Sequence, residues 1–238
     1  MTRSLRSVRW VVGSFALSLL TAGWAFSQEG GLAKENLDLP YDAIGLNEEE
    51  EDAPEVVSFY GQTLEGDGFF YVIDKSGSMQ DSGELTIAKR EVIKNIGEFS
   101  ERVQFGIFFF DKGLTKFPSS GAPAEANPGM KSSAISFTQS TAGGSGSCPQ
   151  AGLVAALNMA NQASSKHKVI VYLGDGGGTC PGSDEEPYLR QTLAAVSAQN
   201  WQRIQINSIG VLQYGAVNEK FMKDLASMNG GTYTKMSR

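Results

Sequence analysis

Short apolar runs alternate along this 238-residue chain with longer stretches in which apolar side chains recur at every third or fourth position. The short runs are typical of strands buried on both faces of a sheet, and the longer stretches are typical of amphipathic helices. Strands are predicted at residues 69–73, 103–110, 114–117, 169–173, 204–212 and 232–235. Helices are predicted at residues 84–101, 150–163, 183–200 and 218–228. Residues 118–133, rich in Pro, Gly, Ser and Ala, are predicted to form a loop.

This alternation predicts an α/β fold of the doubly wound, Rossmann-like type, with a mostly parallel central sheet flanked by helices on both faces. Right-handed crossovers between parallel strands place the strand-to-helix loops at one edge of the sheet. Ligands of such sheets bind outside the carboxyl ends of the strands. The loops that follow the strands at residues 69–73 and 169–173 are therefore the first places to search for function.

The N-terminal 27 residues have the composition of a secretory signal peptide. Arg3, Arg6 and Arg9 form a positive segment, an apolar stretch follows at residues 10–20, and small residues precede a cleavage site after Ser27. The alternative is an uncleaved membrane anchor, because the uncharged run is barely long enough to span a bilayer. The chain is expected to be secreted, or to reside in the periplasm or cell envelope.

Residues 28–60 are predicted to form an acidic, flexible linker. Residues 28–55 hold ten acidic side chains against one lysine and show little helical or strand periodicity. Like charges repel one another, and there is too little apolar area to offset the chain entropy lost on folding. A role in binding calcium or a basic partner is the alternative for the acidic run at residues 48–52.

The charge balance narrows the choice of partners. The formal net charge is −6, and it becomes −9 once the three arginines of the signal segment are removed, with 17 basic against 26 acidic residues. Nucleic acids favour basic protein surfaces, so this balance argues against nucleic-acid binding. Cations and basic patches on partner proteins are the more natural ligands.

The two cysteines predict a disulfide. An even number of cysteines in an exported chain favours a bond, here between Cys148 and Cys180, and two buried free thiols are the alternative. Closing a loop of about 33 residues would contribute roughly 3–4 kcal/mol of stability. Both cysteines lie in loops expected at the ligand edge, so a bond between them would fix these loops relative to each other.

Oxygen-bearing side chains gather in the loops at this edge. Asp74, Ser76 and Ser78 alternate directly after the first buried strand, and Asp175 follows another buried strand. Ser147 ends a Gly- and Ser-rich loop. Carboxylates and hydroxyls are hard ligands that suit Mg²⁺, Mn²⁺ or Ca²⁺ better than zinc, and two converging carboxylates repel each other unless a cation or a proton lies between them. The pattern therefore predicts a divalent-cation site, with Mg²⁺ as the first choice.

These motifs resemble those of the von Willebrand factor A (VWA) domain family. The segment DKSGSM at residues 74–79 is similar to the family's DxSxS motif, part of its metal-ion-dependent adhesion site (MIDAS). LGDG at residues 173–176 is similar to the strand-ending TDG, and residues 147–157 resemble the threonine loop that enters a helix. Residues 221–233 look like the last helix and strand of the family. The resemblance covers roughly residues 65–236, and we expect the VWA domain to span residues 61–238.

The resemblance implies direct metal coordination by Ser76, Ser78 and the residue equivalent to the family's threonine, with Asp74 and Asp175 in contact, often through water. Two departures matter. Serine replaces the threonine in a longer loop, so that Ser145 is an alternative to Ser147, and glycine replaces the threonine before the second aspartate, which removes a hydroxyl. Both departures concern metal affinity more than the fold.

A non-catalytic binding module is the function that we expect. An unidentified partner protein would offer an acidic group to the metal, and we expect a monomer without a small-molecule cofactor. A hydrolase is the less favoured alternative, because the only histidine, His167, precedes a core strand and so lies at the edge opposite to the serines. A scaffold subunit of an envelope assembly, binding through its helix faces and not through the metal, is the third alternative.

Overall fold

The computed structural model describes residues 53–211 and 215–236. The predicted signal peptide, residues 1–27, and residues 28–52 of the predicted linker lie outside the described residues. Within the described ranges, no helix is long and apolar enough to cross a membrane.

The centre of the fold is a seven-stranded sheet with the strand order β5-β4-β3-β7-β8-β9, to which β6 adds by pairing with β4. Neighbouring strands are parallel from β4 through β3, β7 and β8 to β9, whereas β5 and β6 pair antiparallel with β4. The strands are β3 (Gly68–Asp74), β4 (Gln104–Phe110), β5 (Leu114–Phe117), β6 (Ala124–Glu125), β7 (Lys168–Gly174), β8 (Gln205–Gly210) and β9 (Tyr233–Lys235). This arrangement confirms the mostly parallel sheet expected from the apolar runs.

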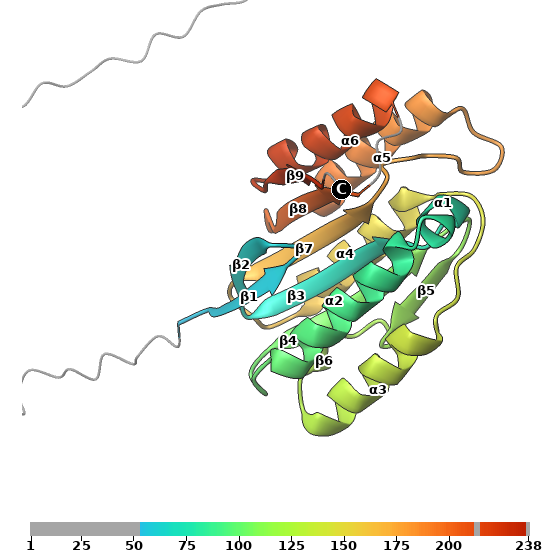
Figure 1. Cartoon of the computed structure of the whole chain (residues 1–238). Helices are drawn as coiled ribbons and strands as arrows, with labels where there is room; N and C mark the ends of the chain where they lie inside the picture. The colour runs from blue at the N-terminus through green and yellow to red at the C-terminus, as the bar shows by residue number, and fades with distance from the viewer. Residues whose placement is uncertain (1–52, 212–214, 237–238) are drawn as a thin grey trace, which may run out of the picture. The chain divides into compact units, whose positions relative to one another are not determined.

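Helices cover both faces of the sheet (Figure 1). Successive side chains of a strand point to opposite faces, so Tyr71 and Ile73 pack with helices α1, α2 and α3, whereas Phe70 and Val72 pack with α4, α5 and α6. The helices are α1 (Gly77–Asp81), α2 (Glu84–Glu98), α3 (Pro128–Ser140), α4 (Pro149–Gln162), α5 (Glu185–Gln199) and α6 (Gly215–Met228). The doubly wound α/β fold is therefore confirmed.

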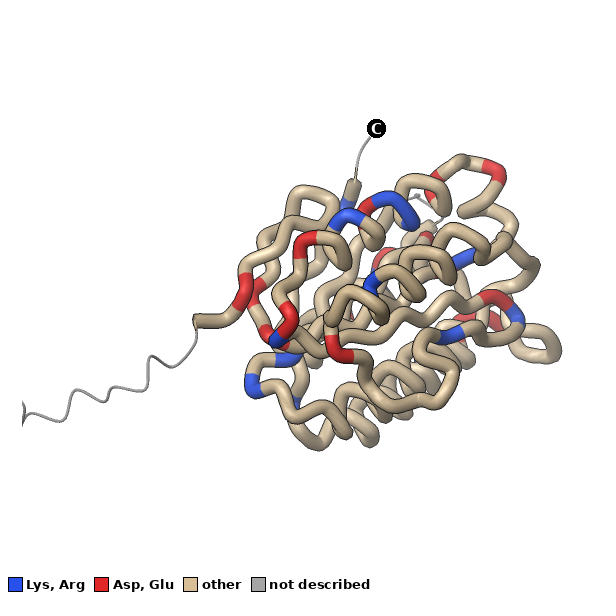
Figure 2. The backbone as a smooth tube through the Cα atoms, turned by 90° about the horizontal axis from the view of Figure 1, so that it is seen from below, with Lys and Arg blue, Asp and Glu red and all other residues tan. Residues whose placement is uncertain are grey.

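Basic and acidic residues are interspersed along the described chain (Figure 2).

A β-hairpin precedes the sheet and corrects one predicted boundary. Strands β1 (Glu55–Phe59) and β2 (Gln62–Gly66) pair antiparallel, although residues 28–60 were expected to be linker. The reason is the alternation of buried and more exposed positions: Val57 and Leu64 pack on the same face of the central sheet as α2. The two-residue turn between the strands has positive φ at both of its residues, the conformation that suits the twist of a tight hairpin.

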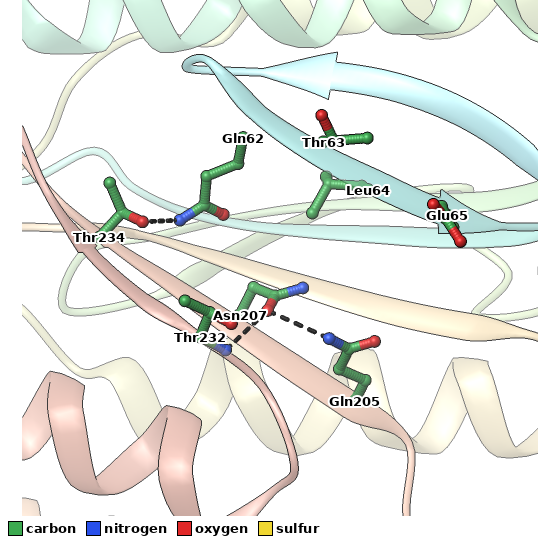
Figure 3. Close-up of a pocket in the computed structure, with 8 residues that line it drawn as sticks. All are labelled: Gln62, Thr63, Leu64, Glu65, Gln205, Asn207, Thr232 and Thr234. Atoms are coloured by element: carbon green, nitrogen blue, oxygen red, sulfur yellow. Dashed lines mark hydrogen bonds between the residues drawn. The ribbon is translucent and has the colours of Figure 1, made fainter.

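The hairpin and the end of the central sheet enclose a polar surface pocket of about 330 Å³ (Figure 3). Amide, hydroxyl and carboxylate side chains of β2, β8 and the start of β9 line most of it, and Gln62 hydrogen-bonds to Thr234 across it. Since β8 begins at Gln205, the pocket includes the amino end of that strand. It is therefore separate from the edge where the candidate ligands were expected.

Helix α3 corrects a second expectation, because residues 118–133 were predicted to be a loop. The loop ends earlier than expected, at Asn127, whose side chain accepts a hydrogen bond of 3.0 Å from the Met130 backbone N–H. Pro128 follows in the first turn, where its missing N–H costs nothing. Only Ala134 and Thr138 of this helix are fully buried, so its apolar periodicity is too weak to be seen in the sequence.

Candidate metal site

The carboxyl ends of two neighbouring strands bring the predicted ligands together. β3 ends at Asp74 and β7 ends one residue before Asp175, and the register aligns Ile73 with Leu173. The loop before α4 reaches the same edge, because the Gly144 backbone N–H donates a 2.7 Å hydrogen bond to the Lys75 carbonyl. All three predicted loops therefore meet where parallel strands end.

Hydrogen bonds connect all five predicted ligands. Ser78 Oγ donates to Asp175 Oδ2 at 2.6 Å and lies 3.1 Å from Ser76 Oγ. The Ser76 backbone N–H donates to Asp74 Oδ1 at 2.7 Å. Ser147 Oγ lies 3.1 Å from Asp74 Oδ2, so the third loop is tied to the first. Three segments that are far apart in the sequence thus form one cluster of oxygen atoms.

The loop after β7 is held by its own backbone. The Gly177 N–H donates a 2.8 Å hydrogen bond to Asp175 Oδ1, and Gly176 has a φ of +78°. A Cβ at position 176 would lie 2.6 Å from the Asn218 carbonyl oxygen, so only glycine allows this approach to α6. The Gly178 N–H donates to Glu185 Oε1 at 3.1 Å. Glu185, in the first turn of α5, thereby joins this loop to the helix.

Burial sets the electrostatics of the cluster. Asp74 is completely buried and Asp175 is 8% exposed. Burial raises the pKa of Asp74 from its ordinary value of 3.8 to about 7, the charge of Asp175 acts in the same direction, and hydrogen bonds from Ser76 and Ser147 partly oppose them. The cluster therefore favours a proton, or a cation in place of a proton, beside Asp74.

The hydroxyl of Ser147 faces two hydrogen-bond acceptors. Ser147 Oγ has two acceptors within reach, Asp74 Oδ2 at 3.1 Å and the Gly177 carbonyl at 2.9 Å, but it carries one proton. If Asp74 is protonated, its own proton satisfies one contact and the Ser147 proton satisfies the other. When Asp74 is ionised, the two acceptors compete for one donor, and a cation would relieve that competition.

A scan against protein-family models gives no match, and no curated protein matches. Solved structures do match. One is a von Willebrand factor type A protein from Catenulispora acidiphila, with a TM-score of 0.62 and 17% identity, covering 74% of this chain and 40% of that one. Another is the vWF domain of the type V pili tip protein Mfa5 from Porphyromonas gingivalis, with a TM-score of 0.57 and 12% identity, covering 71% of this chain and 89% of that one.

This chain has the VWA fold. A third match, proximal thread matrix protein 1 from the mussel byssus, has a zinc-occupied MIDAS motif, with a TM-score of 0.50 and 17% identity over 71% of this chain and 43% of that one. The chain therefore spans less than half of the first and third of these proteins. The shared fold confirms the VWA fold that the motifs at residues 74–79 and 173–176 predicted.

The structure separates the two serines considered for the third VWA loop. Ser145 is exposed, and its backbone carbonyl accepts a 3.0 Å hydrogen bond from the Lys112 N–H. Ser147 is buried, and its side chain contacts Asp74. The geometry favours Ser147 as the third-loop ligand.

Steric crowding explains why glycine, and not a larger residue, precedes Asp175. A Cβ at Gly174 would lie 2.9 Å from the Asp74 Cβ, closer than real side chains approach. The threonine that the VWA resemblance implies at this position would therefore require Asp74 to move. In this chain the two strands place Asp74 directly against the bare backbone of Gly174.

The predicted disulfide is present between Cys148 and Cys180, with a Cα–Cα distance of 4.7 Å. Cys148 directly follows Ser147, and its backbone N–H donates a 2.8 Å hydrogen bond to the Asp111 carbonyl. Cys180 lies in the loop that carries Asp175. The disulfide therefore joins two of the three loops of the cluster covalently.

A further acidic residue at this edge, Asp111, interacts with groups outside the cluster. Its carboxylate accepts a 2.8 Å hydrogen bond from the Gly113 N–H and lies 3.5 Å from Lys75 Nζ. Burial alone would raise the pKa of Asp111, but the Gly113 hydrogen bond and the Lys75 charge outweigh it and lower the pKa below its ordinary value. Asp111 thus belongs to an ion pair beside the cluster.

His167 lies at the other edge, as expected. It directly precedes β7, it is exposed, and its backbone N–H donates a 2.6 Å hydrogen bond to Asp67. A Ser-His-Asp arrangement would need this imidazole beside the serines. Among the described residues there is also no group of three or more His, Cys, Asp or Glu side chains that could hold a metal. Any cation at the cluster must therefore bind hydroxyls together with the two aspartates.

Asp74→Asn is predicted to stabilise the metal-free protein above neutral pH. The folded protein keeps the Asp74 proton up to a pKa of about 7, whereas the unfolded chain releases it near 3.8, so stability falls as pH rises between these values. The difference corresponds to roughly 4 kcal/mol. Urea unfolding with chelator should show the variant to be more stable than wild type at pH 8, with the gap closing toward pH 4. Asp111→Asn is the control: it should be less stable than wild type at pH 8, because the pKa of Asp111 is lowered.

Replacing both cysteines, as in Cys148→Ser with Cys180→Ser, should lower the free energy of unfolding. The chain-entropy argument for a sequence separation of 32 residues gives a loss of roughly 3–4 kcal/mol. Urea unfolding of both proteins, with and without reducing agent, tests this. Reducing agent should destabilise wild type and leave the variant unchanged; equal midpoints for the two oxidised proteins would contradict the expectation.

Proposed function

We propose that this chain is an exported VWA-domain protein that binds a divalent cation and uses it to hold the acidic group of a partner protein, without catalysis. The observation that carries the proposal is the hydrogen-bonded cluster joining Ser78 to Asp175 and Ser147 to Asp74. Three loops converge there, and the oxygen atoms they contribute are those that Mg²⁺, Mn²⁺ and Ca²⁺ prefer.

The residues of the cluster fit such a cation. Ser76, Ser78 and Ser147 would supply neutral oxygens, while Asp74 and Asp175 would supply negative charge directly or through water. Replacing the proton of Asp74 by a cation would neutralise two buried carboxylates at once. A partner carboxylate is the natural additional ligand, since a cation held by few protein charges retains affinity for an anion.

The known proteins with this fold support a binding role. The Mfa5 domain belongs to a pilus tip protein, and the mussel protein carries a metal in its MIDAS motif. The disulfide supports an oxidising compartment, in line with the signal peptide expected at residues 1–27.

Titration calorimetry with Mg²⁺ and with Mn²⁺ tests the metal site. Wild type should bind one ion, and Asp74→Ala should lose at least about tenfold in affinity because it removes a carboxylate from the cluster. Asp111→Ala is the matched control, since it removes a carboxylate at the same edge that is paired with Lys75. Equal affinities of wild type and Asp74→Ala would contradict the proposal.

The Mn²⁺-loaded protein also tests the acidic partner. Water-proton relaxation reports water bound to Mn²⁺, and a carboxylate ligand should displace that water. Adding a short peptide with blocked termini and one aspartate should lower the relaxation enhancement, whereas the same blocked peptide with asparagine should not. An equal response to the two peptides would show that the ion does not accept a carboxylate, and the binding role would then have to use another surface.

A further inference from the structure

Tyr172 lies beneath the cluster of candidate ligands, in the strand that leads to Asp175. It is in β7, two residues before Gly174, and is completely buried. Its ring stacks on Phe110 at a centroid distance of 5.7 Å and meets the edge of Phe221 at 6.0 Å. Aromatic neighbours on two sides therefore hold the ring in one orientation.

The hydroxyl of Tyr172 has no hydrogen-bond partner among the described residues, although it is buried. Tyr71 on the neighbouring strand provides a contrast, since it is equally buried on the other face and its hydroxyl donates a 2.9 Å hydrogen bond to Asn95 Oδ1. An unsatisfied buried hydroxyl destabilises the folded protein, and a hydrogen-bond partner gained when the site is loaded would remove that cost.

The hydroxyl points toward the cluster. The position that a Cβ of residue 174 would occupy lies 3.4 Å from Tyr172 Oη and also 3.4 Å from Asp74 Oδ2. Tyr172 Oη and Asp74 Oδ2 therefore both border the space that a side chain at position 174 would fill. Burial, followed by the charge of Asp74, raises the pKa of Tyr172 well above its ordinary value. The hydroxyl thus keeps its proton and can act as a donor.

We propose that Tyr172 is a positioning residue of the metal site, whose hydroxyl donates a hydrogen bond to the Asp74 carboxylate, directly or through one water, when a cation is bound. This inference rests on the proposed function. A buried carboxylate that must stay ionised to hold a cation gains from a fixed donor, and the aromatic neighbours of Tyr172 fix this one.

Tyr172→Phe tests the proposal, because it removes the oxygen and keeps the ring. Calorimetry with Mn²⁺ should show an affinity about tenfold weaker than that of wild type. The thermal midpoint of the metal-free variant, measured with chelator, should equal or exceed that of wild type, because the variant has lost an unsatisfied buried group. A merely structural hydroxyl would not give this combination of weaker binding and undiminished stability.

Tyr71→Phe is the matched control. It should lower the metal-free midpoint, because Asn95 Oδ1 loses its hydrogen-bond donor, and leave the Mn²⁺ affinity unchanged. A spectroscopic readout complements it: on adding Mg²⁺, the ¹³Cζ resonance of Tyr172 should move while that of Tyr71 stays in place, since this carbon reports hydrogen bonding of the hydroxyl.

The outcomes separate this inference from the proposed function. If wild type and Tyr172→Phe bind Mn²⁺ equally, Tyr172 has no part in the site and the metal-binding proposal stands. If Tyr172→Phe binds more weakly but is also destabilised without metal, as Tyr71→Phe is, the role is structural and the inference is overturned. If wild type binds no Mn²⁺, both proposals fail together.

Discussion

Two aspartates buried side by side at the ends of neighbouring strands impose the main constraint on this protein. Charge repulsion and loss of hydration both oppose their ionisation, and this is reflected in a pKa of about 7 for Asp74. The cation that we propose at this site would neutralise both carboxylates and so remove their mutual repulsion. Three features shape the space around these aspartates. The serine hydroxyls hydrogen-bond to them, the glycine at position 174 leaves room for Asp74, and the disulfide joins two of the loops.

The fold explains how a few residues from distant parts of the sequence form one candidate site. Parallel strands end at a common edge, so Asp74 and Asp175 become neighbours although about 100 residues separate them in the sequence. Backbone hydrogen bonds then position the loops, and the disulfide removes part of their freedom before any ligand arrives. Less ordering remains to oppose binding, which is how a pre-organised site gains affinity.

The sequence predicts those features that depend on local pattern and strand direction. Continuously apolar runs identified the buried strands, and the motifs at their carboxyl ends identified the cluster. Helix α3 was missed, because its start depends on a single asparagine cap and it buries few side chains. The hairpin boundary was missed because acidic residues dominate the preceding segment. The orientation of Tyr172 could not be predicted, since it depends on the register of β7 against β3 and on the rings that enclose it.

The hairpin also fixes where the preceding chain joins the domain. Glu55 pairs with Gly66, two residues before β3 begins, whereas β3 ends at Asp74 beside the cluster. The N-terminal attachment and the candidate ligand site therefore lie at opposite ends of one strand. A ligand held at the cluster would therefore lie the full length of β3 away from the point where the chain enters the domain at Glu55.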